Sequence, residues 1–455
     1  MKKRMYFNAF RMNCVTHMSP GLWVRDDDHM VDYCDLQHWI DFARLLERGC
    51  FDGLFMADIV GPYDVFGGNR DATARGATHF PVNDPMLLVP AMAAATEHLG
   101  FGYTSSIMQH HPFSFARQVS TLDHLTRGRV AWNIVTSFTR SAARNFGLDD
   151  LPDHDERYRM AQEYARLCYR LWEDSWADDA VVRDRPGGRY AEPSRIRDIE
   201  HDGEYYRSHG CHLCEPSPQR TPVLFQAGTS EPGSNFAAEH AECIFVIGAD
   251  EKVAGEYGRG IRERMARFGR KPDDVICFAY MKIITGASDA EATRKYEELL
   301  EQISYDGAMA LLCGWTGIDF SAYDPDSPIE YIETNSVRTV LHSFTLADPG
   351  RTWTLRDVAR FVGIGGAGPV LVGSPERIAD TLETWTEAGV DGFNLSFATM
   401  PHSFEDFIDG VVPLLQRRGR MQREYAPGTM REKLFPGRAA RLTAPHPAAL
   451  VRRPW

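Results

Sequence analysis

A short stretch after one apolar run has the residue types that bind phosphate. Gly228, Thr229 and Ser230 precede Pro232, which the pattern places in the first turn of a helix. Free backbone amides, two hydroxyl groups and the positive end of a helix dipole together favour an anion. The spacing is not that of a Walker loop, because no Gly-Lys-Ser/Thr sequence follows. The stretch predicts a phosphate seat, and the alternative is an ordinary loop with a serine cap.

Polar side chains also end three other apolar runs. Asp58 ends one run, Thr104 lies near the end of the next, and Thr136 and Ser137 end the third. Such groups could hold a polar ligand, or they could satisfy the amides of the loops that follow. The residue types leave both interpretations open.

A histidine and a tyrosine share one face of a predicted helix. Asp153 is followed three residues later by Glu156, which resembles a capping box and predicts a helix start. His154 and Tyr158 are four residues apart and therefore neighbours on that helix. Together they could bind a polar ligand near a helix N-terminus, or they could simply pack on the wall of the fold.

Two motifs suggest metal chemistry only weakly. Cys211 and Cys214 form a single CxxC with no second ligand pair at a suitable spacing. His110 and His111 follow a predicted strand, as in metal-dependent hydrolases. Most other strand ends carry Thr, Ser, Asn or Gly, so we expect no metal site.

The elements that must position these residues alternate between strand and helix. Eight apolar runs, each followed by a helical pattern, predict a (β/α)8 TIM barrel. The predicted strands are 5–10, 53–58, 101–107, 130–135, 222–228, 243–247, 275–284 and 392–397. The predicted helices are 36–48, 85–99, 113–125, 156–172, 232–241, 252–268, 291–302, 375–387 and 404–418. A doubly wound fold would show a glycine-rich first turn, and none follows the first strand.

Three stretches are too long for ordinary barrel loops. We expect 59–84, 174–221 and 303–374 to be insertions at the carboxyl face of the strands, where barrel active sites lie and where long loops can exclude water. Residues 1–425 are predicted to form a single barrel domain. Residues 426–455 show little periodicity and are predicted to form a C-terminal arm.

Composition excludes several classes of protein. The 455 residues carry a net charge of -13, which makes the chain a poor general binder of nucleic acid. No apolar stretch approaches the ~18 residues of a membrane span. The first residues read as a strand and not as a signal peptide. Nine scattered cysteines fit a reducing cytoplasm better than a disulfide framework.

Several ordered segments resemble the flavin-dependent monooxygenases of the bacterial luciferase-like superfamily. The chain is most similar to the nitrilotriacetate monooxygenase group, and within it to the long-chain alkane and dimethyl sulfide monooxygenases. The resemblance spans roughly residues 5–435. The segments that carry it are 8–10 (NAF), 13–17 (NCVTH), 51–58 (FDGLFMAD), 81–85 (PVNDP), 121–133 (TLDHLTRGRVAWN), 154–158 (HDERY), 171–173 (LWE), 214–222 (CEPSPQRTP) and 391–395 (DGFNL).

The resemblance implies a barrel that binds reduced FMN supplied by a separate NAD(P)H-dependent flavin reductase. It implies that the reduced flavin and O2 form a flavin hydroperoxide, which needs a dry site and transfers one oxygen atom to an organic substrate. Residues that match flavin-site positions of the family are Asp58, Thr104, His154, Tyr158, Thr229 and Ser230, with Ser137 and Gly228 as adjacent candidates.

The same resemblance implies a set of active-site residues with two departures. Cys14, His17 and Tyr63 fit the pattern of the alkane enzyme, whereas Phe138 stands in place of a histidine and His79 in place of a glutamine. The departures weaken the case for alkane hydroxylation and leave the oxygenase class intact. An apolar substrate such as a thioether, sulfone, alkane or aromatic is expected from Phe10, Met12, Tyr63, Phe80, Met108 and Phe138.

Other functions stay open. Within the superfamily these are a flavin-consuming lyase and a deazaflavin-dependent dehydrogenase. Outside redox chemistry they are a metal-dependent barrel hydrolase and a non-catalytic flavin-binding protein. Family members commonly pair through the helices after the second and third strands, so we expect a homodimer or a dimer of dimers.

Overall fold

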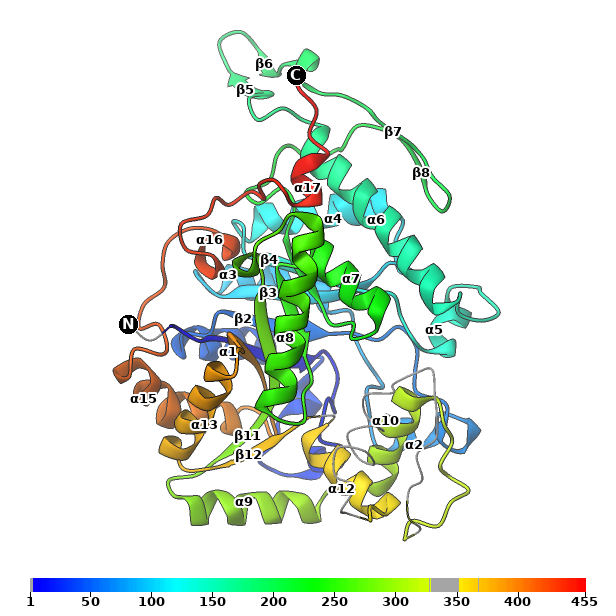
Figure 1. Cartoon of the computed structure of the whole chain (residues 1–455), viewed down its shortest axis with the longest axis vertical. Helices are drawn as coiled ribbons and strands as arrows, with labels where there is room; N and C mark the ends of the chain where they lie inside the picture. The colour runs from blue at the N-terminus through cyan, green and yellow to red at the C-terminus, as the bar shows by residue number, and fades with distance from the viewer. Residues whose placement is uncertain (1–2, 327, 329–351, 367) are drawn as a thin grey trace.

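The computed structural model describes residues 3–326, 328, 352–366 and 368–455. Eight parallel strands close into a ring, because β13 pairs with β1 on one side and with β11 on the other, and β10 also pairs with β11. The strands in ring order are β1 (Tyr6–Met12), β2 (Gly53–Ala57), β3 (Gly100–Ser106), β4 (Val130–Val135), β9 (Val223–Gln226), β10 (Cys243–Val246), β11 (Ile276–Thr285) and β13 (Gly392–Phe397). The predicted (β/α)8 barrel is confirmed (Figure 1).

Aromatic side chains fill the interior of the ring. Phe10 packs edge-on against Phe245 with ring centroids 4.9 Å apart, and Phe55 lies 5.2 Å from Phe225. These rings are buried and belong to one cluster that also includes Tyr6, Phe278 and Tyr280. The barrel is therefore a packed core and not a pore, and a ligand must bind above it at a strand end.

Helices surround the ring and bury one face each on the strands (Figure 1). For example, Asp35 caps the first helix by accepting from the Gln37 amide and Gly49 follows its last residue, so the helix has the predicted bounds 36–48. The helices that follow the strands are α1 (Leu36–Arg48), α3 (Val89–Ala94), α4 (Pro112–Leu125), α6 (His154–Asp174), α7 (Glu231–His240), α8 (Glu251–Met265), α9 (Asp289–Glu301), α13 (Pro375–Glu387), α14 (His402–Asp406) and α15 (Val412–Arg417).

The helix predicted at 85–99 is shorter in the structure. A 3-10 turn, Pro85–Leu88, precedes α3, and Pro90 lies in the first turn of α3. The carboxylate of Glu47 then accepts from the amides of Glu97 and Leu99, so these amides do not extend the helix. A side chain from α1 therefore ends the helical segment early, which local pattern could not reveal.

Two of the three insertions lie at the carboxyl ends of the strands, as predicted. Insertion 59–84 follows β2 and contains α2 (Asp71–Arg75). Insertion 303–374 contains α10 (Tyr305–Thr316), α12 (Leu355–Gly365) and β12 (Val370–Gly373), a further strand of the sheet that, among the described residues, pairs with the last residues of β11 alone. Its residues 327, 329–351 and 367 lie outside the described residues. The described parts of both insertions share an apolar cluster that includes Tyr63, Leu312 and Val358.

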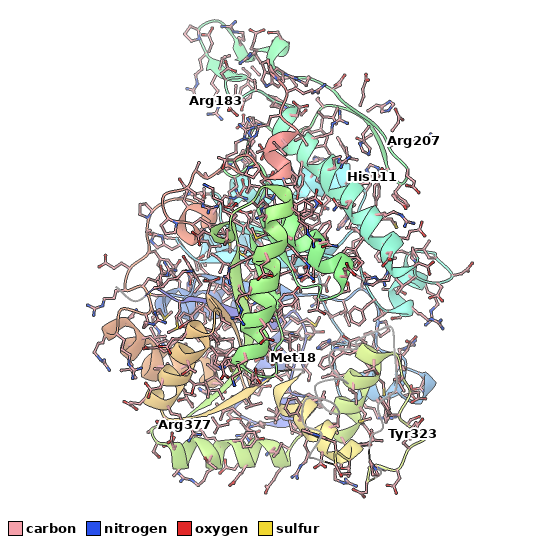
Figure 2. The ribbon with its side chains drawn as sticks, in the orientation of Figure 1. Met18, His111, Arg183, Arg207, Tyr323 and Arg377 are labelled. Carbon is pink, nitrogen blue, oxygen red and sulfur yellow. The ribbon has the colours of Figure 1, made fainter. Side chains whose placement is uncertain are left out.

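The prediction for insertion 174–221 is wrong in its position. It joins the end of α6 to the start of β9, so it lies at the amino ends of the strands. Gln219 there donates to the carbonyl of Val130, the first residue of β4. The insertion forms two hairpins, β5 (Val181–Asp184) with β6 (Arg189–Ala191) and β7 (Ile199–Asp202) with β8 (Arg207–Gly210). Figure 2 shows Arg183 and Arg207 on them, far from Tyr323 of the 303–374 insertion.

The segment 426–455 packs against the amino end of its own barrel. It contains α16 (Met430–Leu434) and α17 (Pro447–Leu450). Arg431 is only 2% exposed, pairs with Glu242 and donates to the carbonyls of Thr221 and Pro222. The segment thus helps to seal the end of the barrel opposite the predicted site, and its boundary at 425 stays a prediction. No helix among the described residues is long and apolar enough to cross a membrane.

Candidate active site

A polar rim runs over the carboxyl ends of β2, β3 and β4. Gln109 donates to the carboxylate of Asp58 at 3.2 Å and accepts from the amide of Ser106. The hydroxyl of Ser137 donates to that of Ser106 at 2.8 Å. The closed ring therefore brings Asp58 and Ser137 together through hydrogen-bonding neighbours on the strand between them.

Burial gives Asp58 an unusual protonation state. Loss of water around the carboxyl, and next the negative charge of Asp84, raise the pKa of Asp58 from 3.8 to about 8. The carboxyl is therefore mostly protonated at pH 7 and can donate a hydrogen bond. It lines a cavity of about 380 Å³ together with Gly61, Phe80 and Gln109. A neutral donor at this strand end suits an uncharged polar ligand.

Thr104 and Ser137 are held by different means. The hydroxyl of Thr104 is buried and accepts from the side-chain amide of Asn133 at 2.9 Å. Ser137 has a φ of +61°, a strained conformation for a residue with a Cβ. Its carbonyl accepts from the guanidinium of Arg157, which helps to fix that conformation. The chain turns at this residue after β4. The hydroxyl of Ser137 bonds to Ser106, whereas the ring of Phe138 lies near that of Tyr63.

Two glycines of the predicted phosphate seat lie close to the hydroxyl of Tyr158. A methyl group added at Gly228 would lie 2.4 Å from the hydroxyl of Tyr158, and one at Gly233 would lie 2.6 Å from the same oxygen. The hydroxyl of Tyr257 donates to the carbonyl of Gly228 at 2.7 Å. A side chain at either position would have to displace the Tyr158 hydroxyl, so this hydroxyl of α6 lies close to the loop after β9.

The two hydroxyl residues of the seat differ in exposure. Ser230 caps α7, because its side-chain oxygen accepts from the amide of Gly233 at 3.2 Å. Thr229 is exposed, and its carbonyl accepts from Ser234. Ser230 therefore has the structural role that the alternative interpretation proposed, and it still lies at the positive end of a helix dipole. Ser230 is therefore both the cap of α7 and a candidate phosphate ligand.

His154 lies at the edge of this region. It is exposed, its ring nitrogen bonds to the neighbouring Asp155 at 3.0 Å, and its ring centroid lies 5.2 Å from that of Tyr158. The capping box predicted for Asp153 is wrong, because the side chain of Asp153 makes no capping hydrogen bond. The shared helix face of His154 and Tyr158 is confirmed.

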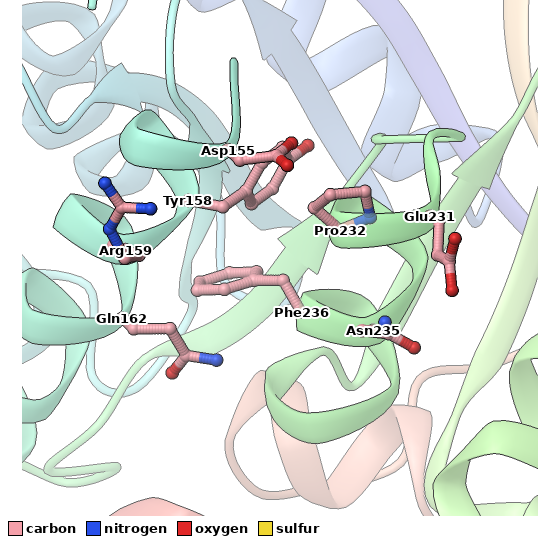
Figure 3. Close-up of a pocket in the computed structure, with 8 residues that line it drawn as sticks. All are labelled: Asp155, Tyr158, Arg159, Gln162, Glu231, Pro232, Asn235 and Phe236. Carbon is pink, nitrogen blue, oxygen red and sulfur yellow. The ribbon is translucent and has the colours of Figure 1, made fainter. Parts of the chain in front are cut away.

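A groove of about 460 Å³ opens beside the seat between α6 and α7. Figure 3 shows Asp155, Tyr158, Arg159 and Gln162 from α6 facing Glu231, Pro232, Asn235 and Phe236 from α7. Acidic and basic side chains both line this groove. Its polar, open character differs from that of the buried cluster described next.

A second group of predicted residues forms a row above the barrel. The ring of His17 lies 5.6 Å from that of His79, which lies 5.4 Å from Tyr63, which in turn lies 6.3 Å from Phe138. Tyr63 and His79 are each 3% exposed, whereas Phe138 is 40% exposed. Because Phe138 follows Ser137, the row joins the polar rim. Four candidates from three distant segments thus meet at the carboxyl end of the barrel.

Burial keeps the ionisable members of this row neutral. Desolvation lowers the pKa of His79 to about 4 and holds that of His17 well below its usual range. It also raises the pKa of Tyr63 and brings that of Cys14 to about 12. Cys14 donates to the carbonyl of Thr16 at 3.1 Å, next to His17 in the chain. A dry cluster of neutral groups can orient or hydrogen-bond a reactant, but it holds no standing charge.

The weak metal motifs find no support. Among the described residues, no group of three or more His, Cys, Asp or Glu side chains could hold a metal ion. The side chain of His111 caps α4 by accepting from the Phe113 amide. All nine cysteines, which include Cys211 and Cys214, are free thiols.

Three residues near the candidate site escaped sequence reasoning. Gln109 precedes the His110-His111 pair and bridges the rim, and Arg157 lies inside the 154–158 motif. Trp315 of α10 donates from its indole nitrogen to the hydroxyl of Tyr63 at 3.0 Å. Position within or beside a motif could have signalled the first two. Nothing local marks Trp315, because its partner lies 252 residues away.

The chain matches the model of the luciferase-like monooxygenase family over residues 21–392. It is 50% identical to dimethyl-sulfide monooxygenase of Hyphomicrobium sulfonivorans, over 99% of this chain and 94% of that one. It is 44% identical to long-chain alkane monooxygenase of Geobacillus thermodenitrificans, over 99% of both.

Solved structures agree in fold and in length. The crystal structure of DmoA from Hyphomicrobium sulfonivorans superposes with a TM-score of 0.93 at 49% identity, covering 99% of this chain and 96% of that one. A riboflavin lyase (RcaE) crystallised with modified FMN and riboflavin superposes with a TM-score of 0.92 at 35% identity, covering 99% and 100%. The chain belongs to the luciferase-like monooxygenase family, as the barrel and its carboxyl-end site indicate.

Proposed function

We propose that this protein is a two-component FMN-dependent monooxygenase. It takes reduced FMN from a separate NAD(P)H-dependent flavin reductase and uses O2 to oxygenate a small, largely apolar substrate. The observation that carries the proposal is the alignment of three features at one end of the barrel. These are the seat at Gly228, the polar rim from Asp58 to Ser137, and the buried row that begins at His17.

The chemistry of the seat and rim suits FMN. Glycine at 228 leaves room that a Cβ would fill, and the amides and hydroxyls at 229–230 offer donors to a phosphate. The rim supplies a protonated carboxyl at Asp58, and the buried side-chain oxygens of Asn133 and Gln226 find no hydrogen-bond partner within the described part of the chain. Such groups can hold a ring system rich in N–H and C=O groups. Bound reduced FMN would supply the two electrons that put one oxygen atom of O2 into the substrate and the other into water.

The buried row suits an apolar substrate and a dry reaction. Tyr63 and Phe138 offer ring surfaces, while His17 and His79 stay neutral. The described parts of the 59–84 and 303–374 insertions pack around Tyr63 and keep water away from it. Phe138 has no proton to give, so this chain differs from an alkane-type site at that position. The identity to dimethyl-sulfide monooxygenase makes a thioether the first substrate to test.

A substrate screen tests the proposal. The purified protein would be incubated with FMN, NADH, a flavin reductase and, in turn, a thioether, a sulfone, a long-chain alkane and an aromatic. We expect mass spectrometry to find one added oxygen atom on at least one substrate, and none when the protein or FMN is left out. Hydrogen peroxide as the sole product with every substrate would contradict the proposal.

The riboflavin lyase structure supports one second candidate, a flavin-consuming lyase. The same mixture with riboflavin as substrate separates the two, because a lyase would destroy the isoalloxazine absorbance of riboflavin. A deazaflavin-dependent dehydrogenase would instead oxidise its substrate without O2 and pass the two electrons to the deazaflavin. A metal-dependent hydrolase would need no flavin and would lose activity to a chelator.

A further inference from the structure

The hydrogen bond of His79 determines which of its ring nitrogens carries the proton. The Nε2 atom bonds to the backbone carbonyl of His17, and a carbonyl oxygen can only accept. Nε2 must therefore be protonated. Because burial keeps the ring neutral, Nδ1 carries a bare lone pair. Nδ1 is buried and has no hydrogen-bond partner among the described residues.

The hydrogen bond of Tyr63 determines the direction of its hydroxyl. The indole nitrogen of Trp315 can only donate, so the oxygen of Tyr63 must accept that bond. The phenolic O–H hydrogen is then free to be donated elsewhere, and no described residue accepts it. Gly314, the residue before Trp315, allows this approach, because a methyl group there would lie 2.3 Å from the ring of Tyr63.

Two neighbouring rings thus carry open hydrogen-bonding atoms of opposite kind. Tyr63 offers a donor and His79 offers an acceptor, and their ring centroids are 5.4 Å apart. A buried donor or acceptor without a partner is costly, so an arrangement that leaves both open favours a ligand that completes both. His79 also has a φ of +50°, a strained conformation of the kind found at functional sites.

We propose that Tyr63 and His79 form a subsite for a group that carries both an O–H hydrogen and an oxygen lone pair, and that Trp315 is the positioning residue that makes Tyr63 the donor. Tyr63 donates to the oxygen of that group, and the O–H of the group donates to Nδ1 of His79. No covalent bond changes in this step. The proposal deepens the oxygenase function and rests on it, because an oxygen-transfer site must hold such a group.

The tautomer can be tested on the protein without any flavin. Histidine labelled with nitrogen-15 gives different signals for protonated and unprotonated ring nitrogens, and the His79→Gln variant assigns the signals of His79. We expect a protonated Nε2 and an unprotonated Nδ1. A protonated Nδ1 with an unprotonated Nε2 would overturn the proposal, whether or not the protein is an oxygenase.

The hydrogen bond from Trp315 to Tyr63 can also be tested by NMR, again without flavin. The indole N–H proton signal that disappears in Trp315→Phe should shift upfield in Tyr63→Phe, because its acceptor is lost. An unchanged indole signal in Tyr63→Phe would overturn the positioning role. Trp176→Phe is the matched control, since its indole also donates one hydrogen bond, to the carbonyl of His212 at the opposite end of the barrel.

Turnover with dimethyl sulfide as the probe substrate then separates positioning from mere packing. One hydrogen bond corresponds to a loss of about three- to tenfold, so Trp315→Phe should lower kcat by about that factor with KM changed less than about twofold. Trp176→Phe should leave kcat unchanged. In the Tyr63→Phe background, Trp315→Phe should have no further effect on kcat, because it acts through the missing hydroxyl. Additive losses, or an equal loss in Trp176→Phe, would contradict the proposal. No oxygenation by the unaltered protein would instead refute the proposed function and leave the two NMR results standing.

Discussion

Asp58→Asn should stabilise the protein at neutral pH although it alters a candidate site residue. The pKa of Asp58 rises from 3.8 in the free side chain to about 8 in the folded state, first through burial and then through the charge of Asp84. A group whose folded-state pKa is raised binds its proton more tightly when folded than when unfolded. For a carboxyl this means that the folded state loses stability as pH rises from 3.8 towards 8. Asparagine keeps the shape and the contact with Gln109 but cannot ionise.

The size of this effect follows from the pKa shift. Each pH unit between the two pKa values costs about 1.4 kcal/mol, so the roughly three units from 3.8 to 7 give at most about 4 kcal/mol. Asp58 is partly exposed, and water at the site mouth reduces this figure. We therefore expect about 2 kcal/mol at pH 7, growing up to pH 8 and shrinking towards pH 4. Melting temperatures from pH 5 to pH 9 measure it, and the gain of Asp58→Asn should increase up to about pH 8 and then level off.

Asp84→Asn is the matched control for this prediction. It removes the neighbouring charge that helps to raise the pKa of Asp58, while asparagine can still cap the turn by accepting from the Met86 amide. In the Asp84→Asn background the gain from Asp58→Asn should still begin near pH 4, but it should be smaller and level off at a lower pH, because Asp58 then ionises more easily in the folded state. A gain for Asp58→Asn that is the same at pH 5 and pH 8, or absent at both, would refute the reasoning.

Four further predictions concern the seat, the substrate pocket and assembly. Replacing Thr229 and Ser230 with alanine should lower FMN affinity at least about tenfold in a fluorescence titration, since hydrogen bonds to a charged group are worth about 1.5–3 kcal/mol each; unchanged affinity would place the phosphate elsewhere. Gly228→Ala should lower FMN affinity by a similar factor, because its methyl group displaces the Tyr158 hydroxyl. Gly260→Ala is the control and should leave FMN affinity unchanged, because its methyl group meets only the end of the Arg264 side chain. Phe138→His should weaken binding of an apolar substrate and leave the melting temperature nearly unchanged, because the ring is 40% exposed and not part of the barrel wall; a large fall in melting temperature with normal substrate affinity would contradict this. Light scattering at micromolar concentration should find a dimer or tetramer. We expect Leu87, which is 76% exposed on the turn before α3, to be part of the contact between subunits. A species of 51.4 kDa alone would contradict the predicted assembly.

Local pattern predicted most of the barrel because each strand and helix carries its own signal. The span 36–48 coincides with α1, since it carries an apolar face and is flanked by a capping aspartate at 35 and a glycine at 49. The same holds for β4 and β13, which are buried apolar runs. Parallel strands place their ends together, so Asp58, Thr104 and Ser137 could be grouped without coordinates.

Two of the failures have a common physical cause, which is contact between distant segments. The early end of the helical segment at 85–99 depends on Glu47 of another helix. The misplacement of insertion 174–221 has another reason: length alone assigns it to the carboxyl face, although it follows the predicted helix 156–172 and precedes the predicted strand 222–228. The partner of Tyr63 is Trp315, in an insertion without a motif. Side chains that act across the fold leave no periodic trace in the sequence.

The central claim is tested most directly by the fate of oxygen in a single turnover. The protein would be mixed without air with chemically reduced FMN and dimethyl sulfide, and then exposed to O2 of a heavy isotope. The account predicts that the organic product carries one heavy oxygen atom and that its amount depends on the Gly228 seat, falling in Gly228→Ala. Label found only in hydrogen peroxide and water, with this and every other substrate of the screen, would contradict the claim that the protein is a monooxygenase.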